Sequence, residues 1–214
     1  MPKPSERSEP PRGAREQART RLARRAVVDA ARALFLERGY AATTIEAVST
    51  RADVPTATVY RLFASKVGIL KALLDTSIAG DDQPVAVQER AHVASLFDEP
   101  DPAVLLGGSA GITTAINERT NDVYRVLVSA SDSDPAAAAL LDDMQRQRDR
   151  GQHQIVSALE RHGSLRDGLT AHQAADLVHA LMAPEVYRLL VVDRKWSADR
   201  YRQWLATTLV QQLT

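Results

Sequence analysis

Apolar side chains recur at helical spacing along most of the chain. Between residues 20 and 38 they stand about one helical turn apart, which predicts an amphipathic helix. The positions that set this period are Leu22, Ala26, Ala30 and Leu34. Gly39 follows, and a glycine there is typical of a helix end. The strongest strand candidate, residues 123–128, also fits a helix. The pattern therefore predicts an all-α protein.

Two short helices are predicted after this first one. Thr44 is suited to cap a helix that runs to about Ala52, and Thr56 is suited to cap another that runs to about Phe63. The intervening residues 53–55 include a proline and break the helix. A longer helix opens at Ser65. Two short helices joined by a three-residue break, behind a longer helix, predict a helix-turn-helix.

Prolines and acidic residues divide the rest of the chain. Breaks at residues 81–84, 98–102, 131–135 and 162–164 separate stretches rich in Ala and Leu. These stretches include 136–161, which has one charged face, and two closing segments at 170–192 and 197–213. Pro184 is expected to kink or break the first closing segment. The sequence predicts a DNA-binding domain at residues 21–80 and a helical bundle at 81–214.

The first twenty residues are rich in Pro, Arg, Glu and Ser and nearly free of large apolar side chains. Such a segment buries too little surface to offset its chain entropy, so residues 1–20 are predicted to be a disordered basic tail. Either this tail reaches a neighbouring minor groove of DNA or it only aids solubility.

Charge is balanced over the 214 residues, with 27 basic and 27 acidic side chains. Its distribution is uneven, because residues 1–80 carry a net +6 and residues 81–214 a net −6. A positive N-terminal part is suited to meet phosphates. The absence of cysteine excludes disulfides, thiolate zinc sites and thiol nucleophiles. No secretory signal and no apolar run of membrane-spanning length is found, so we expect a cytoplasmic protein without membrane contact.

The second short helix has the residues that DNA reading requires. A recognition helix enters the major groove by its N-terminal end, so its first side chains must be small or polar. Here they are Pro55, Thr56, Ala57 and Thr58. Threonine hydroxyls can hydrogen-bond to bases, and alanine or a threonine methyl can pack on a thymine methyl.

The surrounding residues resemble the N-terminal domain of the TetR family of transcriptional regulators. About fifty residues carry the resemblance in order and spacing: Ala31 to Phe35, Gly39-Tyr40, Thr43 to Ile45, Val54, Ala57 to Arg61, Phe63 and Ser65-Lys66. The resemblance implies that Thr43, Thr44, Tyr60 and Lys66 contact phosphates. It also implies that Thr56, Ala57 and Thr58 face bases, with Pro55 and Arg61 in the same surface.

Three positions depart from the family pattern, and the mildest is Ser49, which replaces a small alanine in the first short helix. Asp53 stands where glycine is common, and aspartate tolerates the left-handed turn better than most residues. Leu62 stands where a histidine or tyrosine often contributes to DNA contact.

The resemblance further implies that the remainder binds an effector and forms a homodimer, which would place two recognition helices on a pseudo-palindromic operator. A small-molecule effector of unknown identity would release this regulator, predicted to be a repressor, from double-stranded DNA. Candidate ligand contacts are Asn117, Tyr124, Met144, His153, Met182 and Tyr187. Candidate dimer contacts are Leu177, Leu181, Trp204, Leu205 and Leu209.

Three other functions have partial support in the sequence. Residues 107–111 match the G-x-S-x-G nucleophile elbow, which requires a strand and a parallel sheet that the pattern does not predict. His172, Asp176 and His179 share a helical face, but no further metal ligand is evident. A helical interaction module with a degenerate DNA-binding domain is the alternative to a regulator. We therefore expect no enzyme, and predict no catalytic residue, no metal site and no cofactor.

Overall fold

The computed structural model describes residues 12–80 and 91–214. This part of the chain is helical and contains no strand, so the predicted all-α class is confirmed. It divides into two compact units, the first ending at Leu73 and the second beginning at Leu74. The division falls inside a helix, seven residues before the boundary that the sequence suggested.

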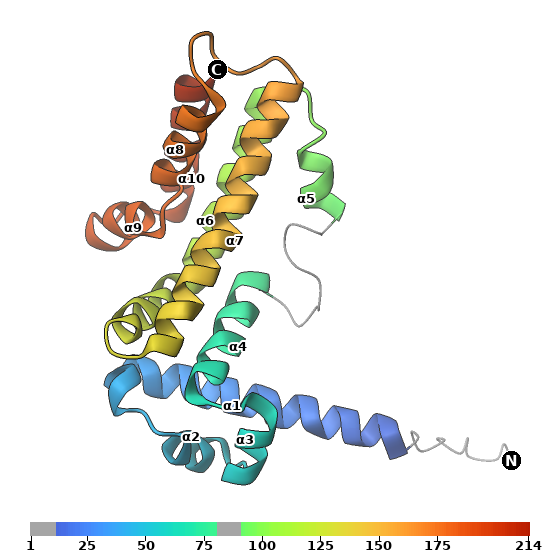
Figure 1. Cartoon of the computed structure of the whole chain (residues 1–214), viewed down its shortest axis with the longest axis vertical. Helices are drawn as coiled ribbons and strands as arrows, with labels where there is room; N and C mark the ends of the chain where they lie inside the picture. The colour runs from blue at the N-terminus through green and yellow to red at the C-terminus, as the bar shows by residue number, and fades with distance from the viewer. Residues whose placement is uncertain (1–11, 81–90) are drawn as a thin grey trace, which may run out of the picture. The chain divides into compact units, whose positions relative to one another are not determined.

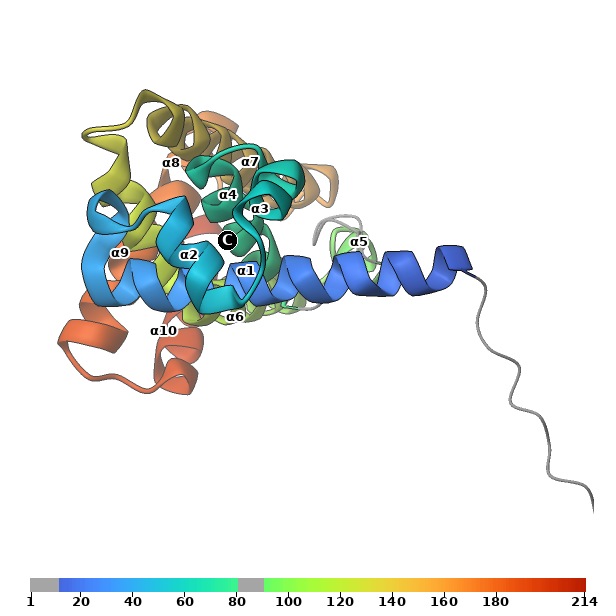
Figure 2. The same cartoon turned by 90° about the horizontal axis from the view of Figure 1, so that it is seen from below.

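The first unit contains three complete helices and the start of a fourth (Figure 1). They are α1 (Arg12–Ala42), α2 (Ile45–Ala52), α3 (Thr56–Phe63) and α4 (Lys66–Ala79). Both short helices pack on α1 and on each other (Figure 2). Val27, Phe35, Val48 and Val59 are buried between them, and this apolar contact fixes the helix-turn-helix.

The first helix begins earlier than predicted. Residues 12–20 lie in α1, although the sequence suggested a disordered tail to residue 20. Arg, Glu, Gln and Ala have high helix propensity, so these residues extend a helix that the core stabilises further along. Residues 1–11 of the predicted tail lie outside the described residues.

The turns of this unit follow from their residues. Gly39 has φ 79° and kinks α1, a conformation that glycine adopts without steric cost. Thr44 caps α2 as predicted, because its hydroxyl accepts from the Ala47 amide at 3.1 Å. The predicted cap at Thr56 is wrong: Thr56 is the first residue of α3, the cap position is Pro55, and no side chain bonds to the free amides.

The second unit is a helical bundle that starts with the last turns of α4. It adds α5 (Ala91–Leu96), α6 (Pro102–Ser131), α7 (Pro135–Arg161), α8 (Ala171–Leu181), α9 (Pro184–Tyr187), a π-helical segment (Arg188–Asp193) and α10 (Ala198–Leu213). The long helices α6 and α7 pack along each other, α10 packs on α6, and α8 packs on α7 (Figure 1).

Helix ends in the bundle match the sequence signals. Asp101, Asp134, Thr170 and Ser197 each accept a backbone amide at the start of the helix that follows, as capping residues do. The predicted break at Pro184 is confirmed, since α8 ends at Leu181 and Pro184 begins a new helix. Across the described residues, no helix is long and apolar enough to span a bilayer.

Candidate DNA-binding surface and ligand cavity

A buried hydroxyl pair fixes the turn between α2 and α3. The Ser49 hydroxyl donates to the Val54 carbonyl oxygen at 2.7 Å and accepts from the Thr56 hydroxyl at 2.9 Å. Asp53 ends α2 in the left-handed conformation with φ 51°. Aspartate tolerates this geometry, so the departure from the family's glycine leaves the turn intact.

The two faces of α3 differ as a recognition helix requires. Val59 and Phe63 are buried in the core of the first unit. Thr56 and Thr58 are half-buried, and the outward face carries Pro55, Ala57, Tyr60 and Arg61. Tyr60 is 47% exposed, although it is a large aromatic residue. The surface is therefore small, weakly polar and free to approach another molecule.

Two residues expected at phosphates have internal partners. Thr43 is fully buried, and its hydroxyl donates to the Gly39 carbonyl oxygen at 2.8 Å. The Lys66 ammonium donates to the carbonyl oxygens of Tyr40 and Thr43 at 2.9 and 3.0 Å. These contacts close the end of α1 against the start of α4. Thr44 remains exposed at the α2 terminus, where helix amides can meet an anion.

Arg24 is a contact that sequence reasoning missed. Its guanidinium donates to the Leu62 carbonyl oxygen at 3.2 Å and lies 4.7 Å from the centre of the Phe63 ring. Such a contact joins α1 to the end of α3 through a cation–π interaction. The spacing of charged residues on α1 gave no sign of it, because the partners lie nearly forty residues away.

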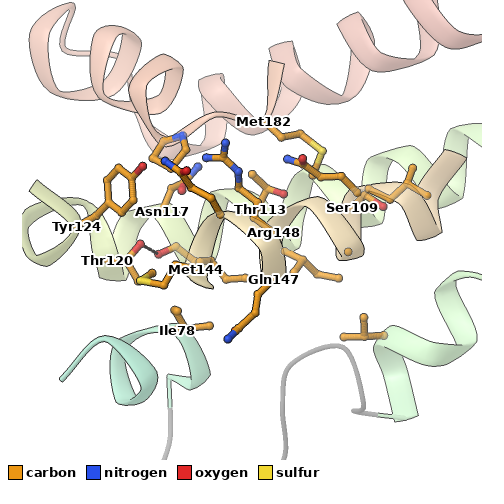
Figure 3. Close-up of a pocket in the computed structure, with 18 of the residues that line it drawn as sticks. Ile78, Ser109, Thr113, Asn117, Thr120, Tyr124, Met144, Gln147, Arg148 and Met182 are labelled. Carbon is orange, nitrogen blue, oxygen red and sulfur yellow. Dashed lines mark hydrogen bonds between the residues drawn. The ribbon is translucent and has the colours of Figure 1, made fainter. Parts of the chain in front are cut away.

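The second unit contains a partly open cavity of about 520 Å³. Its walls come from the end of α4, from α5, α6 and α7, and from the segment after α8. Of the predicted ligand contacts, Asn117, Tyr124, Met144 and Met182 line it (Figure 3). Cavities of this size and mostly apolar lining are typical of small-molecule sites.

Two predicted ligand contacts lie elsewhere. His153 is exposed on α7, where its ring bonds to the Asp149 carbonyl oxygen at 2.9 Å. Tyr187 is buried edge-on against Tyr201, with ring centres 5.0 Å apart. Both predictions are therefore wrong for this cavity: His153 points away from the bundle, and the Tyr187 ring fills the core next to α10.

A polar chain stands at one wall of the cavity. An Arg148 Nη2 atom lies 2.9 Å from His179 Nε2, and His179 Nδ1 lies 3.0 Å from Gln152 Oε1. The amide oxygen can only accept, so His179 carries its proton on Nδ1 and accepts from Arg148. Sequence reasoning missed Arg148 and Gln152, because charged and polar residues on a helix usually mark a solvated face.

Tyr124 lies at the same wall and donates to Glu185 Oε1 at 3.3 Å. Burial raises the pKa of Tyr124 above its usual value, and the nearby Glu185 carboxylate raises it further. The phenol is therefore neutral at physiological pH.

The dimer candidates separate into two groups. Leu177, Leu181 and Trp204 are partly exposed on α8 and α10. Leu205 and Leu209 are fully buried in this chain's own core, so their prediction as interface residues is wrong. The apolar stripe of α10 is used internally, where α10 packs on α6 and α8.

The nucleophile-elbow motif is a helix-packing feature. Residues 107–111 lie within α6, and the buried Ser109 hydroxyl donates to the Leu105 carbonyl oxygen at 2.8 Å. A Cβ on Gly108 would come within 2.6 Å of the Leu96 side chain, so glycine lets α5 approach α6. In the described part of the chain, no three potential metal ligands are grouped.

Comparison with known proteins agrees with this architecture. Residues 27–73 match the family described as bacterial regulatory proteins, tetR family. A curated Bacillus subtilis protein, the uncharacterized HTH-type transcriptional regulator YvkB, is 42% identical over 48 residues. That alignment spans 22% of this chain and a quarter of the length of the relative.

Solved structures extend the likeness to both units at the level of fold. A protein from Saccharomonospora viridis in complex with choline is 21% identical with a TM-score of 0.66, over 89% of this chain and 97% of that one. NalD, a secondary repressor of a multidrug efflux pump in Pseudomonas aeruginosa, is 19% identical with a TM-score of 0.64, over 90% and 96%.

Proposed function

We propose that this protein is a ligand-responsive transcriptional repressor of the tetR family of bacterial regulatory proteins, whose pattern residues 27–73 match. In this proposal it binds a pseudo-palindromic operator in the cytoplasm as a homodimer, and a small molecule releases it. The observation that carries the proposal is the helix-turn-helix whose second helix leaves Pro55, Ala57, Tyr60 and Arg61 outward.

The outward face of α3 supports sequence reading. Ala57 lies in the first turn of the helix, where a methyl group can pack on thymine. Tyr60 and Arg61 follow in the next turn and can reach phosphates, which fix register and orientation. Thr58 is half-buried, so part of its surface remains for a base contact. The Thr56 hydroxyl is committed to Ser49, which leaves its methyl group for apolar contact.

The cavity in the second unit supports release by a ligand. It is separate from the recognition helix, and Ile78 of α4 is part of its wall. Because α4 also begins in the first unit, a ligand that favours one position of α4 has a covalent route to the DNA-binding helices. Such a ligand shifts affinity for DNA only by its own preference between the two states.

Dimer formation is supported by apolar surface on the last helices. Leu177 and Leu181 on α8 and Trp204 on α10 are partly exposed, and Leu189 in the π-helical segment is 54% exposed. Exposed apolar side chains, tryptophan among them, are typical of the core of a homodimer interface. Two copies joined there would supply the two recognition helices that a palindromic site needs.

DNA binding is tested by selecting bound duplexes from a random pool with the full chain. We expect a pseudo-palindrome, and an affinity that falls steeply with salt as phosphate contacts require. Ala57→Asp should abolish binding by placing a carboxylate against DNA, whereas Ala139→Asp on the exposed face of α7 should leave it unchanged. Enrichment of no sequence, or equal binding by both variants, would contradict the proposal.

A further inference from the structure

Two hydrogen-bond donors in the cavity of the second unit have no partner in the described part of the chain. They are Arg148 Nε and Asn117 Nδ2, and both atoms are shielded from solvent. Both residues line the cavity, and Figure 3 shows them together with Thr113 between Tyr124 and Met182. A buried donor without an acceptor is costly, so a ligand that offers an acceptor is favoured if a small turn of either side chain brings the donor to it.

Asn117 is held in place by its surroundings. It is 5% exposed on α6, and its amide lies close enough to the Tyr201 hydroxyl to lower that residue's pKa against the larger effect of burial. The two groups do not reach hydrogen-bond geometry, since both Nδ2 and the hydroxyl oxygen lack a partner. The Asn117 amide nitrogen therefore lacks an acceptor, in a residue that forms part of the cavity wall.

Arg148 has no direct carboxylate partner at this wall. Its hydrogen-bond partner is His179, which is neutral when it accepts from the guanidinium and donates to Gln152. Across the described residues, no carboxylate forms an ion pair with Arg148. Two carboxylates lie in the neighbourhood. Glu185, outside the lining, accepts a hydrogen bond from Tyr124. Asp75 of α4 is the second charged residue of the lining, in addition to Arg148.

Most of the exposed lining surface is apolar, although hydroxyl and glutamine side chains also contribute to it. The apolar part comes from four isoleucines, two methionines, Ala79, Val93 and Phe97, and it suits a hydrocarbon or aromatic body. A cationic ligand would be repelled by the Arg148 guanidinium. The described lining has two aromatic residues, Phe97 and Tyr124, and these do not form an aromatic cage that would offset the repulsion. A carboxylate has two oxygens to offer, one for each unpartnered donor.

We propose that the effector is an apolar organic acid whose carboxylate binds Arg148 and Asn117. The regulatory role of this ligand rests on the proposed function. The preference for a carboxylate does not, because it depends on the cavity alone. The polar chain from Arg148 through His179 to Gln152 orients the guanidinium, and the methionines and isoleucines cover the ligand body.

The preference is tested by calorimetry on the full chain without DNA. The probes are decanoate against 1-decanol and decyltrimethylammonium, and 2-naphthoate against 2-naphthylmethanol. We expect at least one carboxylate to bind about tenfold or more tightly than its matched alcohol, the difference between a charge-assisted and a neutral hydrogen bond. The ammonium should not bind. Equal affinity for acid and alcohol, tighter binding of the ammonium, or no saturable binding of either acid overturns the proposal.

Variants of two arginines on α7 test which side chain gives the cavity its preference for an acid over the matched alcohol. Arg148→Gln should bring the acid to the affinity of its alcohol, and Arg148→Lys should restore part of the difference. The control is Arg146→Gln, which removes the same charge from an exposed residue that lies outside the cavity lining and pairs with Asp143. Thermal melts establish that each variant is folded. An Arg148→Gln protein that is folded and keeps the full preference for the acid overturns the proposal.

Operator binding, measured separately, distinguishes the two proposals. Acid-selective binding by a protein that selects no DNA sequence refutes the repressor function and leaves the ligand class standing. A protein that binds its operator but prefers the alcohol or the ammonium keeps its function and refutes the ligand class.

Discussion

Lys66 contacts Tyr40 through both its backbone and its ring. The ammonium donates to the Tyr40 carbonyl oxygen at 2.9 Å and lies 4.0 Å from the centre of the Tyr40 ring. It also reaches the Thr43 carbonyl oxygen. A cation at carbonyls that end a helix is favoured by hydrogen bonding and by the helix dipole, so Lys66 stabilises the DNA-binding unit from inside.

Lys66→Met should therefore destabilise the protein in the absence of DNA. Hydrogen bonds from a charged group contribute about 1.5–3 kcal/mol, and we expect a loss of about 2 kcal/mol in the free energy of unfolding, measured with urea. Arg38→Met, which removes a positive charge from an exposed residue of α1, serves as the control. If Lys66→Met weakened DNA binding with no loss of stability, the lysine would act at phosphates instead.

Tyr60→Phe tests the outward face of α3. Removing one hydroxyl that reaches a phosphate should weaken binding about fivefold, which corresponds to about 1 kcal/mol. The loss should be similar for operator and random DNA, because phosphate contacts carry no sequence information. Fluorescence anisotropy measures both, with Thr207→Val, on an exposed residue of α10 in the second unit, as the control. A loss confined to the operator would instead assign Tyr60 to base reading.

Arg119→Gln tests the end of α4. The Arg119 guanidinium donates to the carbonyl oxygens of Ser77 and Ile78 at 3.0 and 2.9 Å, and Ile78 also lines the cavity. Without this contact, a bound ligand should act on α4 less strongly. On the proposed function, we expect unchanged ligand affinity and at least a threefold higher ligand concentration for release of DNA.

The matched control for this experiment is Arg125→Gln, on an exposed residue of the same helix α6. The ligand concentration that releases the Arg125→Gln protein from DNA should equal that of the wild type. Equal release of the two variants would show that Arg119 does not transmit ligand binding.

The buried Tyr201 phenol should make the free energy of unfolding fall at alkaline pH. Burial raises its pKa to about 12, whereas a tyrosine in an unfolded chain has a pKa of about 10. Between these values the unfolded state has lost the proton that the folded state keeps, so the free energy of unfolding falls as pH rises. Tyr201→Phe should reduce this fall, as measured by urea unfolding from pH 8 to 11.

At neutral pH the same change should cost little, because the Tyr201 hydroxyl has no hydrogen-bond partner in the described residues. Tyr60→Phe, on an exposed tyrosine, provides the comparison. A Tyr201→Phe protein with the alkaline profile of the wild type would assign the effect to other groups.

Local signals in the sequence were sufficient for most helices. Thr44, Pro184 and Ser197 mark helix ends where the structure has them, because a cap or a proline acts on its neighbouring amides whatever the tertiary context. The tail was predicted less well. Residues 12–20 are helical, since low hydrophobicity says little about a segment that extends an already stable helix.

The sequence by itself determined the all-α class, the order of the helices and the position of the recognition helix. The first two depend on apolar periodicity and on capping residues, and the third on about fifty residues that resemble the N-terminal domain of the TetR family. Only the tertiary structure decided which side chains meet. Lys66 has partners more than twenty residues away, Arg148 reaches His179 on another helix, and Leu205 faces inward. Apolar spacing marks a buried face without saying what covers it, so core, cavity and interface separate only when the helices pack.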